Sequence, residues 1–306
     1  MNSLNLTTTT ARRALLGYIF LWGASSVYLG LCGADWSFPI ISFVVFGLIL
    51  SSIIWFLTRQ NDAPAIPILH SKRESVGLLC YLLVYSVVFL GWAFGPIKSV
   101  FPAGQIQEIW VISIKLLVHV ILPTALILWL GGEVRSQWTA GIKQKGFWLT
   151  FATLSLLLIG LLALVSPSLK QIAALQLSPI LAVLWFFAAW AWISIEAGLC
   201  EEYLFRALLQ SRLDALLKSP VTAIVISSII FALCHVPGLY LRGTPETDGY
   251  STNLLQVVAF TIATLSPLSI ALGVLWARTR SLLLVVLVHG AIDALPSTAE
   301  FVRIWS

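Results

Sequence analysis

Long apolar stretches separated by short polar loops make up most of the chain from residue 14 to residue 295. Most of them are about twenty residues long, the length that an α-helix needs to cross a bilayer. Apolar and polar positions do not alternate within them, so helices are favoured over the strands of a membrane β-barrel. The pattern predicts an all-α, polytopic transmembrane helical bundle. The predicted segments are 14–32, 37–57, 77–95, 110–131, 147–165, 179–200, 220–240, 254–275 and 282–295.

Prolines mark the expected ends of two of these segments. The segment at 282–295 is short for a complete crossing and is followed by Pro296, so we expect a partial span there and about eight or nine membrane segments in all. Pro237-Gly238 is expected to end or kink the helix that begins at Pro220. That break would fall just after His235.

Composition excludes an ordinary soluble protein. Charged residues make up 10% of the 306 positions and hydrophobic residues 59%, whereas soluble domains are about a quarter charged. The four cysteines lie within or at the ends of apolar segments and form no CxxC pair, so we expect neither a disulfide framework nor a cysteine-type zinc site. They are Cys32, Cys80, Cys200 and Cys234.

Basic residues alternate along the loops. The loops after the second, fourth, sixth and eighth segments are rich in Arg and Lys, and the loops between them hold one basic residue each. Cytoplasmic loops carry an excess of Lys and Arg, so this alternation predicts a multi-pass protein with a cytoplasmic N-terminus. The formal net charge of +5 then reflects topology, and the bilayer rather than nucleic acid is the expected partner.

Ionisable residues at membrane depth gather in the second half of the chain. The first half holds Lys115 and His119, which lie four apart and so share a helix face, and we expect them to be structural partners of Glu196. The remaining groups place the chemistry in a core at 179–296, with 1–178 as a scaffold and 297–306 as a short tail. These groups are Glu201, Glu202, His235, His289 and Asp293.

Two adjacent carboxylates, Glu201 and Glu202, close the sixth apolar stretch. Glu202 and Arg206 are four residues apart, so they are expected to pair on one helix face. Glu201 is rotated by about 100° from Glu202 and points elsewhere. One carboxylate is then held by an arginine while the other is left to face a cavity, and different environments give two carboxylates separate roles.

Both histidines of the core sit in spaced patterns. In Phe231-x-x-x-His235 the aromatic ring lies one turn before the imidazole and is expected to pack on it. In His289-x-x-x-Asp293 the carboxylate lies on the histidine's face, where it can fix the tautomer and support the imidazolium. Carboxylates and histidines that are shielded from bulk water suit a hydrolase.

Together, EExxxR, then FxxxH, then HxxxD resemble the type II CAAX prenyl protease family, whose bacterial branch is called CPBP or Abi intramembrane proteases. The resemblance covers roughly 196–296 and includes the basic turn of Arg278 and Arg280. It implies a glutamate-type intramembrane endopeptidase without a cofactor. The implied substrate is a membrane protein or a lipidated peptide, and the implied location is a bacterial inner membrane.

The resemblance also implies roles for the motif residues. Glu201 and His235 would activate a water, and Glu202 with Arg206 would orient that group. His289 and Asp293 would stabilise the oxyanion. The eukaryotic enzymes have Asn at the position of Asp293, and an ionised aspartate cannot donate a hydrogen bond. Asp293 is therefore alternatively expected to orient His289.

Other functions remain open on the sequence alone. Glu201, His235 and His289 together match a two-histidine, one-carboxylate zinc set, although no HExxH motif is present. A cysteine nucleophile at Cys200 or Cys234 is disfavoured because adjacent helical side chains diverge. The remaining alternatives are a non-proteolytic immunity or scaffold protein and a proton-coupled transporter; no internal repeat supports the transporter.

Overall fold

The computed structural model describes residues 4, 8–141, 144–245 and 247–306. Helices dominate this part of the chain and no strand occurs in it, which confirms the predicted all-α class. Its helices include nine that are long and apolar enough to cross a membrane, so the protein is an integral multi-pass membrane protein. These nine run over Thr9–Leu31, Ser37–Leu57, Ser71–Lys98, Gln105–Trp129, Phe147–Val165, Pro179–Leu217, Pro220–Arg242, Leu254–Thr279 and Leu282–Trp305.

Several of the nine combine α-helical turns with wider π-helical turns, labelled η. In chain order the elements are α1 (Thr9–Leu31), α2 (Ser37–Ser42), η1 (Phe43–Leu50), α3 (Ser51–Leu57), α4 (Ser71–Val84), η2 (Tyr85–Ala93), α5 (Phe94–Lys98), α6 (Gln105–Leu116), η3 (Leu117–Ile121), α7 (Leu122–Trp129), α8 (Arg135–Thr139), α9 (Phe147–Val165), α10 (Ser168–Ala173), α11 (Pro179–Ile193), η4 (Ser194–Leu199), α12 (Cys200–Glu202), η5 (Tyr203–Gln210), α13 (Ser211–Leu217), α14 (Pro220–Cys234), α15 (Val236–Arg242), α16 (Leu254–Thr279) and α17 (Leu282–Trp305).

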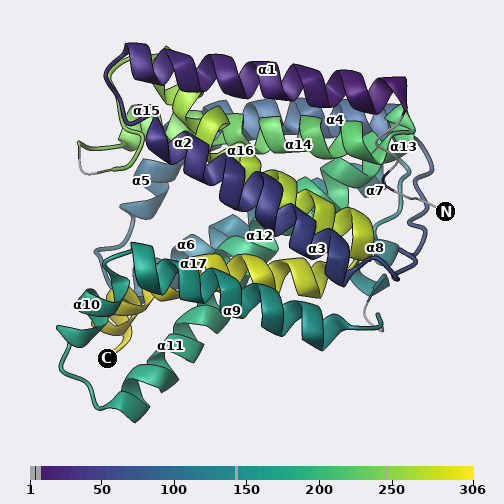
Figure 1. Ribbon diagram of the computed structural model, residues 1–306. Coiled ribbons are helices and arrows are strands. Elements are labelled where there is room, and N and C mark those ends of the chain that lie inside the picture. Colours follow the sequence, from purple (N-terminus) through teal and green to yellow (C-terminus); the bar gives the residue numbers. More distant parts are fainter. Residues whose placement is uncertain (1–3, 5–7, 142–143, 246) are drawn as a thin grey trace.

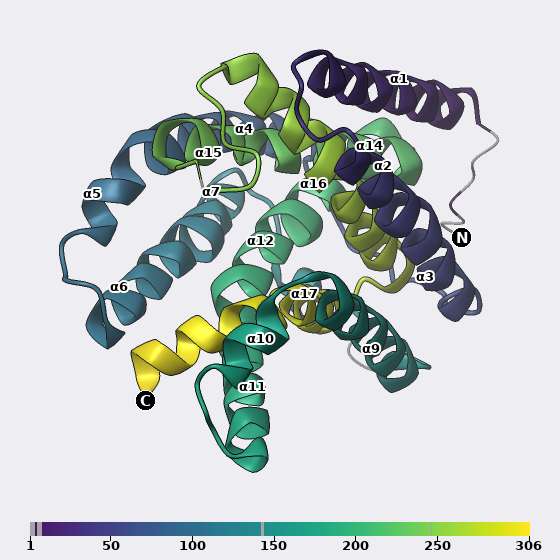
Figure 2. The same cartoon turned by 60° about the vertical axis from the view of Figure 1, so that its left-hand side comes forward.

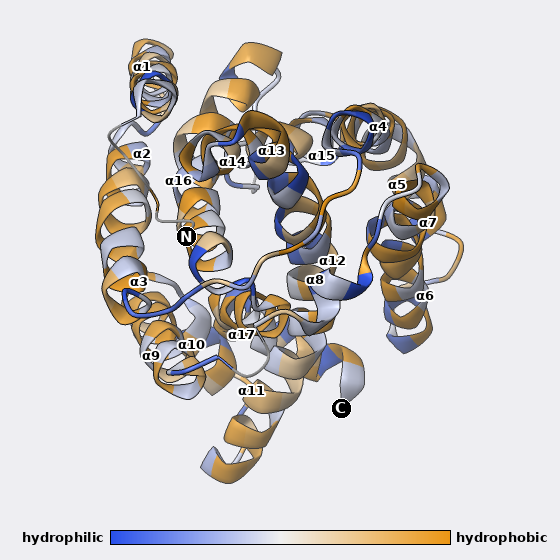
Figure 3. Cartoon of the chain, turned by 90° about the vertical axis from the view of Figure 1, so that its right-hand side faces the viewer, coloured by the Kyte–Doolittle hydropathy of each residue, from blue (hydrophilic) through white to orange (hydrophobic). Residues whose placement is uncertain are grey.

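The helices lie side by side, with the described N-terminal end at one end of the bundle and the C-terminus toward the other (Figure 1). Viewed after a 60° turn, α12 lies near the middle of the molecule, with α14, α16, α17 and α6 around it (Figure 2). The outward sides of α3 and α9 carry mostly apolar residues (Figure 3), as a lipid-facing surface requires. The short element with the two glutamates is therefore enclosed by other helices.

Local sequence explains where the seventh span begins and breaks. The side chain of Ser219 accepts a hydrogen bond from the backbone N–H of Thr222, and Pro220 takes a first-turn position, where a missing N–H costs nothing. The α-helix stops at Cys234, and α15 begins again at Val236. The predicted interruption at Pro237 is confirmed, and His235 lies in the break.

The expected ending of the last segment is wrong. Helix α17 runs through Pro296 to Trp305, 24 residues in all, so the segment that begins at 282 does not end at 295 as expected. Aromatic packing explains the extension: the rings of Trp305 and Trp192 have centroids 5.0 Å apart, and Phe301 packs on Trp185 of α11 at 5.9 Å. Burial of these rings favours continuing the helix beyond its proline.

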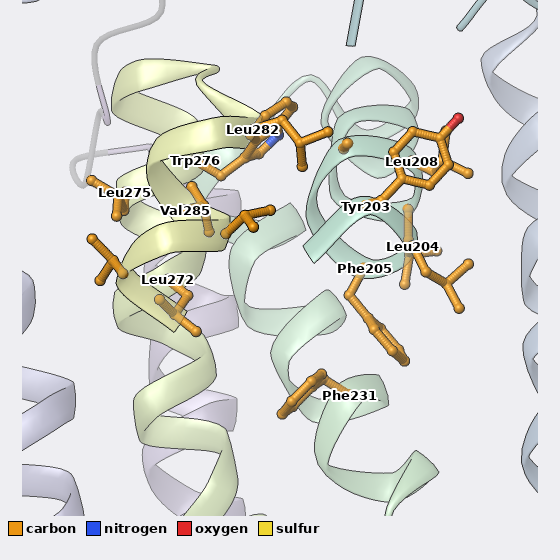
Figure 4. Close-up of a cluster of buried hydrophobic side chains, with 14 of the residues drawn as sticks. Tyr203, Leu204, Phe205, Leu208, Phe231, Leu272, Leu275, Trp276, Leu282 and Val285 are labelled. Atoms are coloured by element: carbon orange, nitrogen blue, oxygen red, sulfur yellow. The ribbon is translucent and has the colours of Figure 1, made fainter. Parts of the chain in front are cut away.

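A buried apolar cluster surrounds the next turn after the two glutamates (Figure 4). Side chains of η5 pack there against α14, α16 and α17, and Trp276 is fully buried among them. The cluster fixes the rotation of η5 and, with it, the direction in which Glu202 and Arg206 point. Its labelled members are Tyr203, Leu204, Phe205, Leu208, Phe231, Leu272, Leu275, Trp276, Leu282 and Val285.

Candidate active site

Two glycines let α17 approach the helix that carries the glutamates. A Cβ added to Gly198 would lie 2.7 Å from the backbone oxygen of Val286, and one added to Gly290 would overlap the side chain of Ser194. Larger residues would therefore push the two helices apart. The close approach brings His289, beside Gly290, next to α12.

Glu202 is fully buried and bridges two partners. Its Oε2 lies 3.2 Å from Nε of Arg206, which confirms the pairing predicted from their spacing. Its Oε1 accepts a hydrogen bond of 2.6 Å from Nδ1 of His289. Arg206 also donates to the hydroxyl of Ser269 at 3.1 Å and lies over the ring of Phe231. Glu202 therefore links Arg206 to His289, and all three are residues of the predicted site.

His289 is surrounded by carboxylates. While Nδ1 bonds to Glu202, Nε2 lies 3.4 Å from Oδ2 of Asp293 and 3.8 Å from Oε2 of Glu201. The expected sharing of one face by His289 and Asp293 is therefore seen. The two carboxylates differ in exposure, since the side chain of Asp293 is 41% exposed and that of Glu202 is buried. The contact of His289 with Glu202 is therefore shorter and better shielded from solvent than its contact with Asp293.

Glu201 and His235 border a cavity of about 240 Å³. Nδ1 of His235 lies 2.8 Å from the carbonyl oxygen of Phe231, and only a protonated nitrogen can bond to a carbonyl, so Nε2 of the neutral ring is an acceptor. Phe231 packs on the His235 ring with centroids 4.7 Å apart, as predicted. The cavity is lined by Tyr85, Phe89, Leu90, Phe94, Lys115, His119, Glu201, Phe205, Cys234, His235, Gly238, Leu239 and Arg242.

The N-terminal half contributes one wall of this cavity, through side chains of η2, α5, α6 and η3. Nζ of Lys115 pairs with Oε1 of Glu196 at 2.5 Å, as expected. His119 instead bonds through Nε2 to the hydroxyl of Tyr85 at 2.8 Å. Nothing in the spacing of residues identifies Tyr85, because it lies 34 positions from His119.

The alternative zinc set is a geometric expectation about Glu201, His235 and His289. Within the described residues, no three His, Cys, Asp or Glu side chains converge in a way that could hold a metal ion. Nε2 of His289 faces the carboxylates of Glu201 and Asp293, at 3.8 Å and 3.4 Å. The site instead supplies carboxylates, imidazoles and an ammonium group, which suit proton transfer and charge stabilisation.

Comparison with known proteins gives a match over the part of the chain that contains the motif residues. Residues 182–295 match the family model described as Type II CAAX prenyl endopeptidase Rce1-like. The Rce1-like region contains all the motif residues from Glu201 to Asp293, and it confirms the resemblance that the motifs indicate. At the level of the family it indicates a membrane endopeptidase, a hydrolase. Searches of the curated proteins and of the solved structures gave no match.

Proposed function

We propose that the chain is an intramembrane endopeptidase in which Glu201 and His235 activate a water without a metal. The observation that carries the proposal is their shared position on one cavity inside the helical bundle. Nε2 of His235 has no hydrogen bond to any described residue, so it is available to a ligand in the cavity. The Rce1-like match supports a peptide bond as the target.

In the proposed reaction, a water between Glu201 and His235 attacks the carbonyl carbon of the scissile peptide bond. As the C–O bond forms, the water's proton passes to the Glu201 carboxylate, and Nε2 of His235 accepts the second hydrogen bond. The π electrons of the carbonyl move onto its oxygen. When the C–N bond breaks, the proton goes to the leaving amine, and the products are an acid and an amine.

The remaining motif residues would hold Glu201 in place. Nε2 of His289 lies 3.8 Å from Oε2 of Glu201. His289 is itself held by Glu202 at 2.6 Å, and Arg206 holds Glu202 in turn. Residues that hold a reacting group from behind its first contact keep it in the productive geometry. Asp293 would orient His289, since an ionised carboxylate accepts hydrogen bonds and cannot donate one to an oxyanion.

The cavity supports a membrane-associated substrate, either a membrane protein or a lipidated peptide. Its walls include Phe89, Phe94, Phe205 and Leu239, which suit apolar side chains of a peptide. The alternating basic loops support a cytoplasmic N-terminus, and a bacterial inner membrane is the location that goes with the CPBP branch.

The test is cleavage of a membrane-tethered peptide library by purified protein in liposomes. Glu201→Gln and His235→Gln should each lower the rate by about 10²–10⁴-fold, with unchanged thermal unfolding. Lys170→Met, which alters an exposed side chain on α10, is the matched control and should cleave normally. Cleavage by Glu201→Gln at the normal rate would favour a non-proteolytic scaffold and sink the mechanism.

A further inference from the structure

A glutamine lies buried four residues after Arg206, at the end of η5. Gln210 is 2% exposed, and its Nε2 donates a hydrogen bond of 2.9 Å to the backbone oxygen of Gly273 in α16. Its Oε1 has no hydrogen-bond partner among the described residues. Burying an amide costs folding free energy unless its hydrogen bonds are made, so an apolar side chain would suit folding better at this position.

The oxygen that Gln210 contacts does not need this donor. Gly273 lies inside α16, which continues to Thr279, so helical geometry already supplies its carbonyl with the N–H of the residue four positions on. A carbonyl oxygen has two lone pairs and can accept a second bond. The bond from Gln210 is therefore additional to those that form α16, and its effect falls on η5.

Arg206 and Gln210 contact α16 in the same way. Arg206 donates to the hydroxyl of Ser269 at 3.1 Å, and Gln210 donates to Gly273, which lies four positions further along α16. In an α-helix, side chains four residues apart are rotated by about 40° from one another. The turns of η5 are π-helical and therefore wider, which brings Arg206 and Gln210 more nearly into line. Two hydrogen bonds thus join one face of η5 to α16.

The space around the amide of Gln210 is tight. A Cβ added to Gly273 would lie 3.0 Å from Oε1 of Gln210 and 3.1 Å from Cγ2 of Ile224 in α14. Because position 273 has no side chain, η5 can lie close enough to α16 for the amide to reach the backbone. A rotation of η5 would therefore break the bond between Gln210 and Gly273.

Building on the proposed function, we infer that Gln210 is a positioning residue of the proteolytic site. Its bond to α16 fixes the rotation of η5 and, with it, the direction of Arg206. Arg206 pairs with Glu202 at 3.2 Å, and Glu202 holds His289 at 2.6 Å. His289 in turn lies 3.8 Å from Oε2 of Glu201. Gln210 therefore acts on the reacting carboxylate through this network, without touching the substrate.

The competing explanation is that Gln210 only fastens η5 to α16. A purely structural bond predicts that Gln210→Met lowers the thermal stability and that the molecules that remain folded cleave at the normal rate. A positioning role predicts the opposite result. The carbonyl of Gly273 keeps its helical partner and methionine fills a similar space, so the variant should fold normally and cleave slowly.

The experiment measures kcat and KM for peptide cleavage in liposomes, with thermal unfolding of each variant. We expect Gln210→Met to unfold like the wild type and to lose about 10–100-fold in kcat, as on removal of a residue that orients a reacting group, with little change in KM. Gln107→Met is the matched control, because Gln107 is also buried and donates to the carbonyl oxygens of Lys98 and Phe101 outside the site. This control should unfold at a lower temperature and keep a normal kcat.

A second set of variants tests the path through Arg206. Ser269→Ala removes the other acceptor in α16, so it should also lower kcat. Because both contacts act on the same guanidinium, we expect the losses in Gln210→Met/Ser269→Ala to be clearly less than additive. Independent, additive losses would overturn the shared path. If Gln210→Met does not fold, Gln210→Asn, whose shorter amide stays polar, takes its place and should show the same loss of kcat.

Normal kcat in a folded Gln210→Met or Gln210→Asn variant would overturn the positioning role. This failure is separable from failure of the proposed function, because Glu201→Gln is measured in the same liposomes. If Glu201→Gln is inactive while the Gln210 variants cleave normally, only the inference about Gln210 fails. If Glu201→Gln cleaves normally, the water mechanism fails and the positioning role fails with it.

Discussion

The protein contains two buried glutamate–arginine pairs that look alike in isolation. Glu202 and Arg206 lie 3.2 Å apart, and Glu74 and Arg212 lie 3.0 Å apart. All four side chains are at most 1% exposed. The number and burial of the charges therefore do not tell which of the two pairs serves function and which serves stability.

The pairs differ in what surrounds them. Arg212 also donates to the carbonyl oxygen of Glu133 at 3.0 Å, and Glu74 accepts from the backbone N–H of His70 at 2.7 Å, so this pair joins α13 to α4 and nearby loops. Glu202 instead contacts His289, and His289 lies 3.8 Å from Glu201, which borders the cavity. A buried charge at membrane depth thus points to function when its network reaches a cavity, and otherwise to stability.

The largest expected effect comes from breaking the pair near the cavity. Arg206→Ala should lower the free energy of unfolding by about 3–5 kcal/mol, since it leaves the buried carboxylate of Glu202 unpaired. It should also lower cleavage by the folded protein, because Glu202 no longer holds His289 in place. Chemical unfolding and single-turnover cleavage of the same preparation separate the two losses. Normal cleavage per folded molecule would remove Arg206 from the site.

The distant pair should show the stability loss alone. Arg212→Ala is expected to lower the free energy of unfolding by a similar amount, about 3–5 kcal/mol, while cleavage per folded molecule stays at the wild-type rate. The double variant Glu74→Met/Arg212→Met removes both charges and should recover most of the stability. A fall in the cleavage rate of that double variant would contradict the distinction between the pairs.

Helical spacing was enough to predict the contacts within one helix. Glu202 with Arg206 and His289 with Asp293 are each four residues apart, and both pairs form. The length of the apolar segments likewise predicted the all-α bundle. The end of the last span is not predictable in this way. Helix α17 continues past Pro296 because Phe301 and Trp305 pack on α11, and that packing depends on tertiary structure.

Contacts between helices far apart in the chain cannot be predicted from the spacing of residues. The bond from His289 to Glu202 joins positions 87 apart, and that from Arg212 to Glu74 joins positions 138 apart. Neither spacing carries a helical period. The contribution of Tyr85 to the cavity wall is not predictable for the same reason, since its contact with His119 joins positions 34 apart.

A smaller effect on cleavage is expected at Asp293, the most exposed of the three carboxylates around His289. Asp293→Asn should change the cleavage rate less than tenfold, because a partly exposed ion pair contributes about 0.2–1 kcal/mol. The distance of 3.4 Å to Nε2 of His289 and the 41% exposure of Asp293 both indicate a weak interaction. Steady-state kinetics of Asp293→Asn beside wild type measure the change. A loss as large as that of Glu201→Gln would restore a direct role for Asp293.

The smallest expected effect is that of metal removal. The described residues bring no three His, Cys, Asp or Glu side chains together around one ion. Dialysis against a strong chelator should therefore leave both the cleavage rate and thermal unfolding unchanged. Loss of cleavage that zinc alone restores would instead join Glu201, His235 and His289 into a metal site. The comparison of the two pairs would then need revision, because Glu202 would act by orienting a metal ligand.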